Sequence, residues 1–573
     1  MRGRFGPAAV SSAVAIVVAL VLGGCSTAHQ TEKTNGAVLA SSVSVPAVQP
    51  PQAAARRPVL VHGWAASLQT GMPANLPGTP AVAPCQPADQ ATGWLARENA
   101  RPGNTSWQVH YRTSTAQVVG YLGQTSAACG DHVAVHLSSA GGPAQIKVFR
   151  VGWYHGAGAR LVWTSTVLTV RPQRQARPNG ATRVIQENWP TTTTIPITPS
   201  YPPGLSLVEF VSLRDHAVSA APLVVSDPTS SAPVAVQLSA ATWAAYNTYG
   251  GASLYHGPGR LNALRSFEAG LSRPLVGDGL RELLVRDVAL VHQVERLGLD
   301  TAYLTDFDVD ATPSLLLTHH EIIIPGHAEY WTARMVHALE AARNAGVNEA
   351  WLGANDVSWQ IRINRTANGQ PTGVVCYRTF ADPVAASEPA LATVRWYQDP
   401  GPALDAGALV GQRYAGLKMD SGLRLRTAPS WLVTGTGLHI GSLLPNAAAN
   451  EVNGIVTLRG LPPNLQVIAE GVFHRAGQLW PVDMTYYTAP SGAAVFSVGT
   501  TDWACQIDGS CADHHIPRTE ASLLQRLTAN LIRAFAQTGF GTTHPSTLTP
   551  PTPFTALARS LPAGQVGTAG RPE

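Results

Sequence analysis

The stretch from Glu321 to Ile363 constrains the fold more than any other part of the chain. It reads EIIIPGHAEYWTARMVHALEAARNAGVNEAWLGANDVSWQIRI. The apolar run at 322–325 is too short for a helix and is followed by Gly326, which is typical of a buried strand in a parallel sheet. Apolar residues then recur at helical spacing up to Gly346, and a second short strand covers 350–353. The stretch therefore predicts a strand–helix–strand unit of an α/β domain.

A polar loop follows each of these two strands. The first loop carries His327, Glu329 and Tyr330, and the second carries Asn355 and Asp356. Because ligands bind at the carboxyl ends of strands in open α/β sheets, both loops are expected to border one site. Single residues here also have simple structural interpretations, such as a carboxylate that stabilises a helix start. It is the grouping of the five side chains that favours a functional role.

Composition and pattern divide the rest of the chain. With 573 residues it is long enough for two or three domains. Short strands separated by turn residues over 86–228 predict an all-β, Ig-like sandwich. Strands alternate with helices over 229–543, which predicts α/β architecture with a mostly parallel sheet. Residues 26–85 are expected to form a flexible tether, and residues 544–573 a loose tail.

The segment 1–25 has the pattern of a bacterial lipoprotein signal. Arg2 and Arg4 precede an apolar run over 13–22 that is too short for a membrane span. The run ends in Leu-Gly-Gly-Cys, so Cys25 is expected to carry the lipid after cleavage. The alternative is an ordinary signal peptide with a chance cysteine. Lipidation predicts an extracytoplasmic protein, anchored to the cell membrane through its N-terminal lipid.

Five cysteines remain, and an oxidising compartment favours disulfides among them. Cys505 and Cys511 lie six positions apart around a turn and are predicted to pair. Cys85 and Cys129 form a second candidate pair. Cys376 lies in an apolar run typical of a strand, so a buried small side chain is the preferred interpretation over a nucleophile.

Charge and missing motifs argue against several functions. The 39 basic and 35 acidic residues give a net charge of +4, without a basic run interleaved with aromatics, so no nucleic-acid partner is expected. The α/β region lacks both a G-x-S-x-G elbow and an H-E-x-x-H pair. A hydrolase built on this chain would therefore activate water with a metal. Phenolate and carboxylate ligands suit a hard ion such as ferric iron.

A series of short motifs carries a resemblance to a known family. They are RVGWYHGAGAR at 150–160, NTYGG at 247–251, YLTD at 303–306, PGHAEYW at 325–331, GAN at 353–355 and AVFSVGTTDW at 494–503. Together, and in this order, they resemble the large (beta) subunit family of N,N-dimethylformamidase, in particular its C-terminal region. The resemblance covers roughly 110–540.

The resemblance implies an Ig-like sandwich joined to a domain similar to class I glutamine amidotransferases, without their cysteine nucleophile. It also implies hydrolysis of a small N-substituted formamide with one iron ion held by two tyrosines and a glutamate. Tyr330 matches one tyrosine, and Glu451 matches the glutamate. Ser358 stands where the second tyrosine is expected, which leaves Tyr377 as the candidate for that ligand.

Two functional hypotheses follow. The first is a membrane-tethered, metal-dependent hydrolase of a non-peptide C–N bond in a small-molecule amide. In it, His327 and Asn355 are the candidates for proton transfer and for binding the oxyanion. The second is a non-catalytic cell-envelope protein that binds a saccharide or protein ligand and has lost the metal site. An intact set of two tyrosines and a glutamate around one point would favour the first hypothesis.

Overall fold

The computed structural model describes residues 92–107, 109, 118–398, 400–402, 404, 406–456, 460–511, 514–562 and 564–568. The predicted signal, the tether, Cys25 and Cys85 lie outside these residues. In the described part of the chain, no helix has the length and apolar character needed to cross a membrane.

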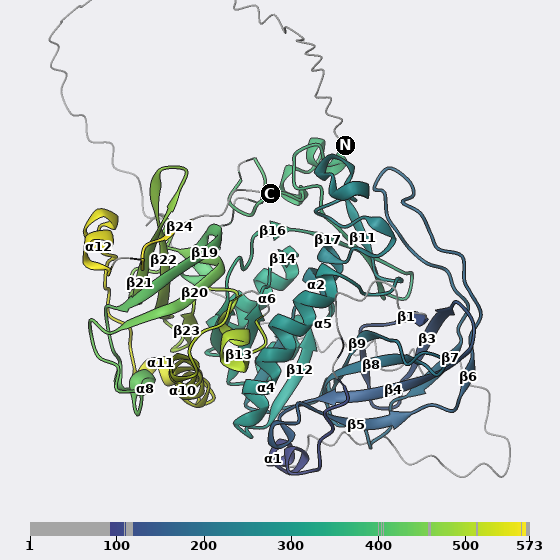
Figure 1. The fold of residues 1–573 in the computed structure, drawn as a ribbon. Helices are drawn as coiled ribbons and strands as arrows, with labels where there is room; N and C mark the ends of the chain where they lie inside the picture. Colours follow the sequence, from purple (N-terminus) through teal and green to yellow (C-terminus); the bar gives the residue numbers. More distant parts are fainter. Residues whose placement is uncertain are drawn as a thin grey trace, which may run out of the picture. The chain divides into compact units, whose positions relative to one another are not determined.

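Two sheets near the start of the described chain share one apolar core (Figure 1). The first consists of β1 (Val118–Leu122), β3 (His132–Ser139) and β7 (Thr193–Pro196). The second consists of β2 (Ser126–Ala128), β9 (Val218–Ser226), β8 (Gly204–Ser212), β4 (Pro143–Val151), β5 (Ala159–Thr164) and β6 (Leu168–Thr169). Alternate residues of β3 are buried, as expected for a strand with one face on a core. This two-layer arrangement agrees with the predicted sandwich, and its Ig-like character stays a prediction.

A ten-stranded mixed sheet runs through the α/β region. One half is parallel, in the order β12 (Thr301–Thr305), β10 (Val234–Leu238), β13 (Glu321–Gly326), β15 (Asn348–Gly353) and β23 (Ala494–Ser497). The other half continues antiparallel through β22 (Gln478–Thr488), β21 (Gln466–Arg475), β19 (Arg413–Leu425) and β20 (Leu443–Gly454). The tenth strand, β24 (Gly567–Thr568), pairs with β21 at one side. The prediction of a mostly parallel sheet is therefore right for only one half. The turn between β21 and β22 shows why, since a two-residue connection at Ala476 and Gly477 permits only an antiparallel hairpin.

The order of the parallel strands creates a binding crevice. The parallel strand that comes first in the chain, β10, lies between β12 and β13. The direction of winding therefore reverses between β10 and β13. Helix α2 (Ala240–Tyr246) follows β10, and α6 (Ala333–Asn344) connects β13 to β15. The predicted strand–helix–strand unit is thus present, and Thr332 caps α6 by accepting from the Met335 amide at 3.2 Å. Doubly wound sheets bind ligands at such a reversal of strand order.

Further helices pack on this sheet. They are α3 (Asp278–Glu282), the π-helical turn η6 (Leu283–Val288), α4 (Ala289–Arg296), α5 (Asp306–Ala311), α9 (Trp503–Asp508) and α10 (Arg518–Phe535). The residues from 544 to 568, expected to form a loose tail, include α12 (Phe554–Ser560) and β24 (Gly567–Thr568). Leu557 and Leu561 pack on Val472 of β21. Their helical spacing, with Phe554, supplies an apolar face that the composition of the segment conceals.

A buried ion pair links the sandwich to the α/β region. Arg150 of β4 donates from Nη2 to Oε1 of Glu295 on α4 at 2.7 Å, and from Nη1 to Oε2 at 3.0 Å. Both side chains are 0% exposed. Asn99 and Tyr303 also donate to the Glu295 carboxylate. The pair is therefore closed off from water and surrounded by further hydrogen-bond donors.

Candidate active site

A cavity of about 400 Å³ lies at the carboxyl ends of the parallel strands. Its wall combines Tyr246 from the end of α2, His327 and Glu329 after β13, and Asn355 after β15. Glu451 of β20 closes it from the antiparallel half of the sheet. The cavity thus occupies the crevice that the strand order predicts.

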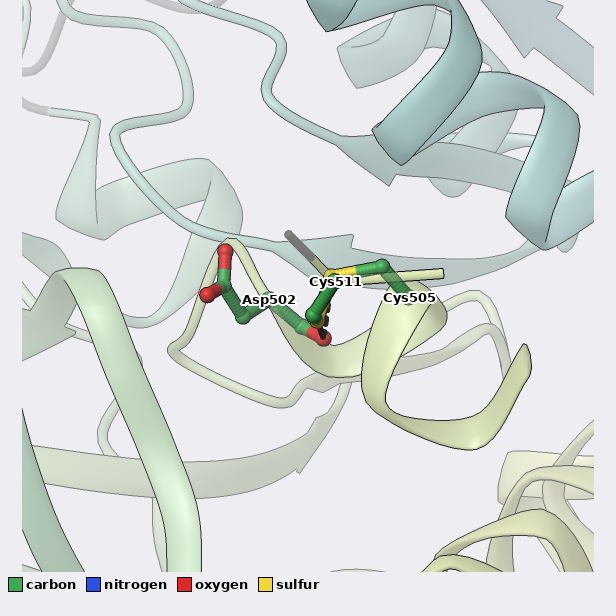
Figure 2. Close-up of side chains that lie close together, drawn as sticks. All are labelled: Asp502, Cys505 and Cys511. Atoms are coloured by element: carbon green, nitrogen blue, oxygen red, sulfur yellow. Dashed lines mark hydrogen bonds between the residues drawn. A yellow bond between two sulfur atoms is a disulfide. The ribbon is translucent and has the colours of Figure 1, made fainter. Parts of the chain in front are cut away.

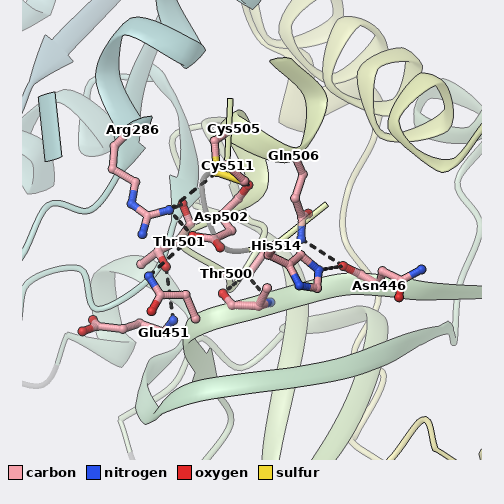
Figure 3. The surroundings of a disulfide bond; sticks show 12 residues. Arg286, Asn446, Glu451, Thr500, Thr501, Asp502, Cys505, Gln506, Cys511 and His514 are labelled. Carbon is pink, nitrogen blue, oxygen red and sulfur yellow. Dashed lines mark hydrogen bonds and ion pairs between the residues drawn. A yellow bond between two sulfur atoms is a disulfide. The ribbon is translucent and has the colours of Figure 1, made fainter. Parts of the chain in front are cut away.

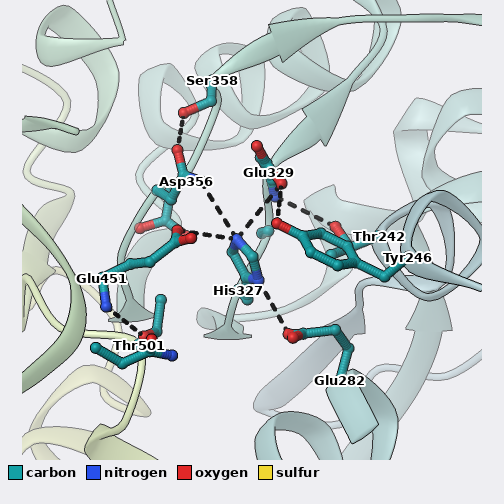
Figure 4. A network of polar contacts seen from close by, with 12 residues as sticks. Thr242, Tyr246, Glu282, His327, Glu329, Asp356, Ser358, Glu451 and Thr501 are labelled. Atoms are coloured by element: carbon teal, nitrogen blue, oxygen red, sulfur yellow. Dashed lines mark hydrogen bonds and ion pairs between the residues drawn. The ribbon is translucent and has the colours of Figure 1, made fainter. Parts of the chain in front are cut away.

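Two phenols converge on the carboxylate of Glu329. Tyr246 donates to Oε2 at 2.9 Å, and Tyr255 donates to Oε1 at 2.5 Å (Figure 4 shows the Tyr246 contact). The indole of Trp359 also donates to Oε1, at 2.9 Å. Glu329 is 1% exposed. Burial beside this carboxylate raises the pKa of both phenols well above the usual value, so both carry their protons in the absence of a cation.

His327 lies at the centre of the acidic groups (Figure 4). Its Nδ1 is 2.9 Å from Oε2 of Glu282, and its Nε2 is 3.3 Å from Glu451 and 3.5 Å from Glu329. Burial alone lowers the pKa of His327, but the carboxylates of Glu451 and Glu282 outweigh it and raise that pKa well above the usual value. Burial likewise opposes ionisation of Glu282, and His327 and Arg286 nonetheless hold its pKa at about 2. The raised pKa favours the charged form of His327, whose Nδ1 faces Glu282.

The loop after β15 holds the Asn355 amide against His327. Asn355 and Val357 have positive φ angles of 56° and 49°. This conformation is strained for Val357, because its side chain is β-branched. The side-chain oxygen of Asn453 accepts from the backbone N–H of Asn355 at 2.8 Å. The Ser358 hydroxyl donates to the side-chain oxygen of Asn355. The Asn355 Nδ2 then lies 3.4 Å from Nε2 of His327. Strain of this kind persists where surrounding contacts fix the geometry, and it concentrates at functional sites.

A buried layer behind the cavity supports Glu451. The Glu451 amide donates to the Thr501 hydroxyl at 3.2 Å, and Arg286 donates to the Thr501 carbonyl at 3.0 Å (Figure 3). Arg286 also pairs with Asp502 and lies 3.7 Å from Glu282. The Arg286 guanidinium therefore contacts both Glu282 and the segment that supports Glu451, the two carboxylates that lie closest to His327.

Cys505 and Cys511, the pair that the spacing predicts, form a disulfide in this layer (Figure 2). Their sulfur atoms lie close to Asp502, yet the three residues are no metal site, since the bond consumes both thiolates and Asp502 is paired with Arg286. The free Cys376 is buried, and burial raises the pKa of its thiol to about 12. That is the inert side chain expected from its setting. Cys85, the predicted partner of Cys129, lies outside the described residues.

The structure brings together only some of the predicted site residues. His327, Asn355 and Glu451 meet in the cavity, as described above. Tyr330 is buried beside Glu329, and its hydroxyl has no hydrogen-bond partner among the described residues. Tyr377 is half-buried and stacks on Phe267, with ring centroids 4.8 Å apart, so its side chain does not join the predicted metal set. The strand register explains this, because Tyr377 follows β18 (Pro371–Val375), which pairs with β11 and β17 away from the parallel strands.

The sequence-based interpretation missed Tyr246, Tyr255 and Glu282. The two tyrosines flank the NTYGG motif, and Tyr246 ends the helix that follows the first parallel strand. A search for oxygen donors after every parallel strand would have found Tyr246. Glu282 lies at the end of α3, and no motif around it in the sequence marks it as a site residue.

At pH 8 the imidazole of His327 is expected to remain protonated on both nitrogens, whereas an ordinary histidine, with a pKa of about 6.5, is neutral. Because the folded-state pKa is raised, the associated stability is fully present below the unfolded pKa and is lost as pH rises through the folded pKa. ¹⁵N NMR of histidine-labelled protein measures this, with His327→Gln identifying the resonance. A neutral ring at pH 8 would contradict the arrangement.

Comparisons with known proteins give the family of the chain. A family model described as N,N-dimethylformamidase beta subunit-like, C-terminal, matches residues 145–516. This span covers more than half of the 573 residues and includes all six motifs on which the resemblance rests. A search of curated proteins found no match. The matched residues include Tyr246, His327, Glu329 and Glu451, so the chain, cavity included, belongs to the N,N-dimethylformamidase beta subunit-like family.

Proposed function

We propose that the protein is a metal-dependent hydrolase of a non-peptide C–N bond in a small-molecule amide. The observation that carries the proposal is the convergence of the Tyr246 and Tyr255 hydroxyls on the two oxygens of Glu329. Two tyrosines and one glutamate are the ligand set that the family resemblance implies for iron. These residues replace the set of Tyr330, Tyr377 and Glu451 in the proposal, because Tyr377 follows β18, which pairs with β11 and β17, and its ring stacks on Phe267.

The chemistry of these donors fits a ferric ion. Phenolate and carboxylate oxygens are hard ligands, and a cation is what both phenols need in order to lose their protons beside Glu329. The three side chains come from separate parts of the chain, so the fold and not a local motif assembles them. A bound ferric ion would act as a Lewis acid that polarises an amide carbonyl and acidifies water.

The remaining residues of the cavity supply proton transfer and orientation. His327, fixed at Nδ1 by Glu282, is placed to give its Nε2 proton to a leaving nitrogen. Glu451, 3.3 Å from Nε2, is placed to receive a proton from water. Asn355, held by Asn453 and Ser358, presents its amide beside His327 for binding an oxyanion.

The alternative is a cell-envelope binding protein without catalysis. It predicts that Ser358 faces an empty pocket, and Ser358 does line a cavity of about 460 Å³. Its hydroxyl, however, donates to Asn355, and a tyrosine pair is supplied by α2 and the loop that follows it. This arrangement favours the hydrolase. We further propose that the lipid on Cys25 holds the enzyme at the extracytoplasmic face of the membrane.

Metal content and the visible spectrum test the proposal. The purified protein is expected to hold iron in a one-to-one ratio with the chain and to show a tyrosinate charge-transfer band. Tyr246→Phe and Tyr255→Phe should each shift or abolish the band, whereas Tyr397→Phe, a change at a side chain that is 57% exposed, should leave it intact. A colourless protein that stays metal-free after iron is offered would refute the iron mechanism.

A further inference from the structure

Arg395 lies on a wall shared by two cavities. With Tyr414 it lines both the cavity around His327 and a neighbouring cavity of about 460 Å³, here called the outer cavity. Its guanidinium lies 4.1 Å from the ring centroid of Trp359 and 5.3 Å from that of Tyr414. Among the described residues, no carboxylate forms an ion pair with Arg395 and no acceptor takes a hydrogen bond from its side chain. A half-buried guanidinium is thus held in place by aromatic rings with its donors available.

Three arginine side chains line the outer cavity. Arg413 and Arg475 line it together with Arg395, and Arg475 is fixed by Trp480, at 5.1 Å from the ring, and by the Ala415 carbonyl, at 2.7 Å. Asp356 is the one carboxyl among the described lining residues. It is 2% exposed and accepts from Asn453, and burial raises its pKa to about 7. Asp356 therefore offsets little of the charge of Arg395 and Arg475.

The inner cavity holds charges of both signs. Its carboxylates Glu282, Glu329 and Glu451 contact His327 or the phenols, and Asp278, Arg260, Arg281 and Arg378 also line it. Trp359 connects the two regions, because Arg395 lies over its ring while its indole nitrogen donates to Glu329 at 2.9 Å. The Trp359 ring therefore lies between the Arg395 guanidinium and Glu329, the proposed metal ligand. A small neutral amide would occupy the inner cavity and leave Arg395 without an anion.

We propose that the substrate is a small amide bearing a carboxylate, which Arg395 binds while the amide group reaches Glu329. The inference rests on the proposed function for the identity of the reacting group. A planar guanidinium matches a carboxylate through two parallel hydrogen bonds, and stacking on Trp359 and Tyr414 fixes its orientation in advance. Because the Trp359 ring lies between Arg395 and Glu329, an N-acyl amino acid is the class of substrate proposed.

N-formylglycine and N-formylglycinamide test the inference, because they share the formamide and differ in the charged carboxylate. Arg395→Gln is expected to raise KM for N-formylglycine by about 10- to 100-fold, the range for a hydrogen bond to a charged group, and to leave N-formylglycinamide unchanged. Arg296→Gln is the matched control, since Arg296 also lies over a tryptophan, 4.7 Å from the ring of Trp153, but outside both cavities. Added salt should weaken only the charged substrate, without any mutation.

Calorimetric binding separates this inference from the proposed function. N-formylglycine should bind more tightly than N-formylglycinamide, and Arg395→Gln should remove the difference, even if neither compound is hydrolysed. Binding without hydrolysis would refute the activity on these amides and keep the anion site. Hydrolysis of both amides with equal KM, unaffected by Arg395→Gln or by salt, would overturn the anion site and keep the hydrolase.

Discussion

Replacing Glu329 by glutamine is expected to lower kcat for amide hydrolysis by about 1000-fold or more and to abolish iron binding. Glutamine keeps the size of the side chain but removes the negative charge. It also removes one of the two oxygens that accept from Tyr246 and Tyr255. The phenols then lose the partner with which they would share a cation. Iron content, the tyrosinate band and kcat measured on one preparation report the three losses together.

Glu340→Gln is the control for this variant. Glu340 lies on α6, close to Glu329 in sequence, and its carboxylate accepts from His337 on the helix surface. It should keep the iron, the band and the activity. If Glu329→Gln retained iron, the ligand set would have to be sought among other oxygen donors, with Tyr330 and Glu451 as the first alternatives.

Replacing Arg150 by methionine is expected to lower the free energy of unfolding by about 3–5 kcal/mol, the cost of leaving a buried partner charge uncompensated. The carboxylate of Glu295 loses the two hydrogen bonds, at 2.7 and 3.0 Å, that offset its desolvation. Arg150 also donates to the Pro203 carbonyl at 2.9 Å, and methionine leaves that acceptor unsatisfied. Urea unfolding followed by tryptophan fluorescence measures the loss.

Two further variants serve as controls for this measurement of stability. Arg150→Met combined with Glu295→Leu removes both charges and should recover part of the lost stability, since the isolated carboxylate is the main cost. Arg101→Met removes a residue that is 57% exposed and 3.6 Å from Glu98, and it should cost less than about 1 kcal/mol. Equal effects of Arg150→Met and Arg101→Met would show that the buried pair does not hold the two regions together.

The local patterns in the sequence were sufficient for several elements. The run at 322–325, the helical spacing that follows and the second strand predicted β13, α6 and β15. The loops after these strands placed His327 and Asn355 at one edge of the sheet, where their nitrogens lie 3.4 Å apart. Periodicity works here because each element forms through contacts within a few residues and has one face on the core.

The proposed metal ligands could not be found from such patterns. Tyr246 and Tyr255 contact Glu329 across 83 and 74 residues of chain, and neither tyrosine has a spacing that marks it as a ligand. Tyr377 was proposed because Ser358 stands where the second tyrosine is expected, but it follows β18, which belongs to another sheet. The mixed direction of the large sheet arose in the same way, from long hairpins that no single strand pattern reveals.

The sequence alone thus determined the parallel strand–helix unit, the disulfide pair, the family and the edge of the sheet where the candidate site lies. Only the tertiary structure decided which tyrosines meet Glu329, how Glu451 reaches His327 from β20, and why Arg395 stands without an anion between two cavities. The physical reason is that hydrophobic periodicity encodes which face of an element is buried. The partner opposite a polar side chain is fixed by the order and register in which distant strands pack, and that is a property of the whole fold.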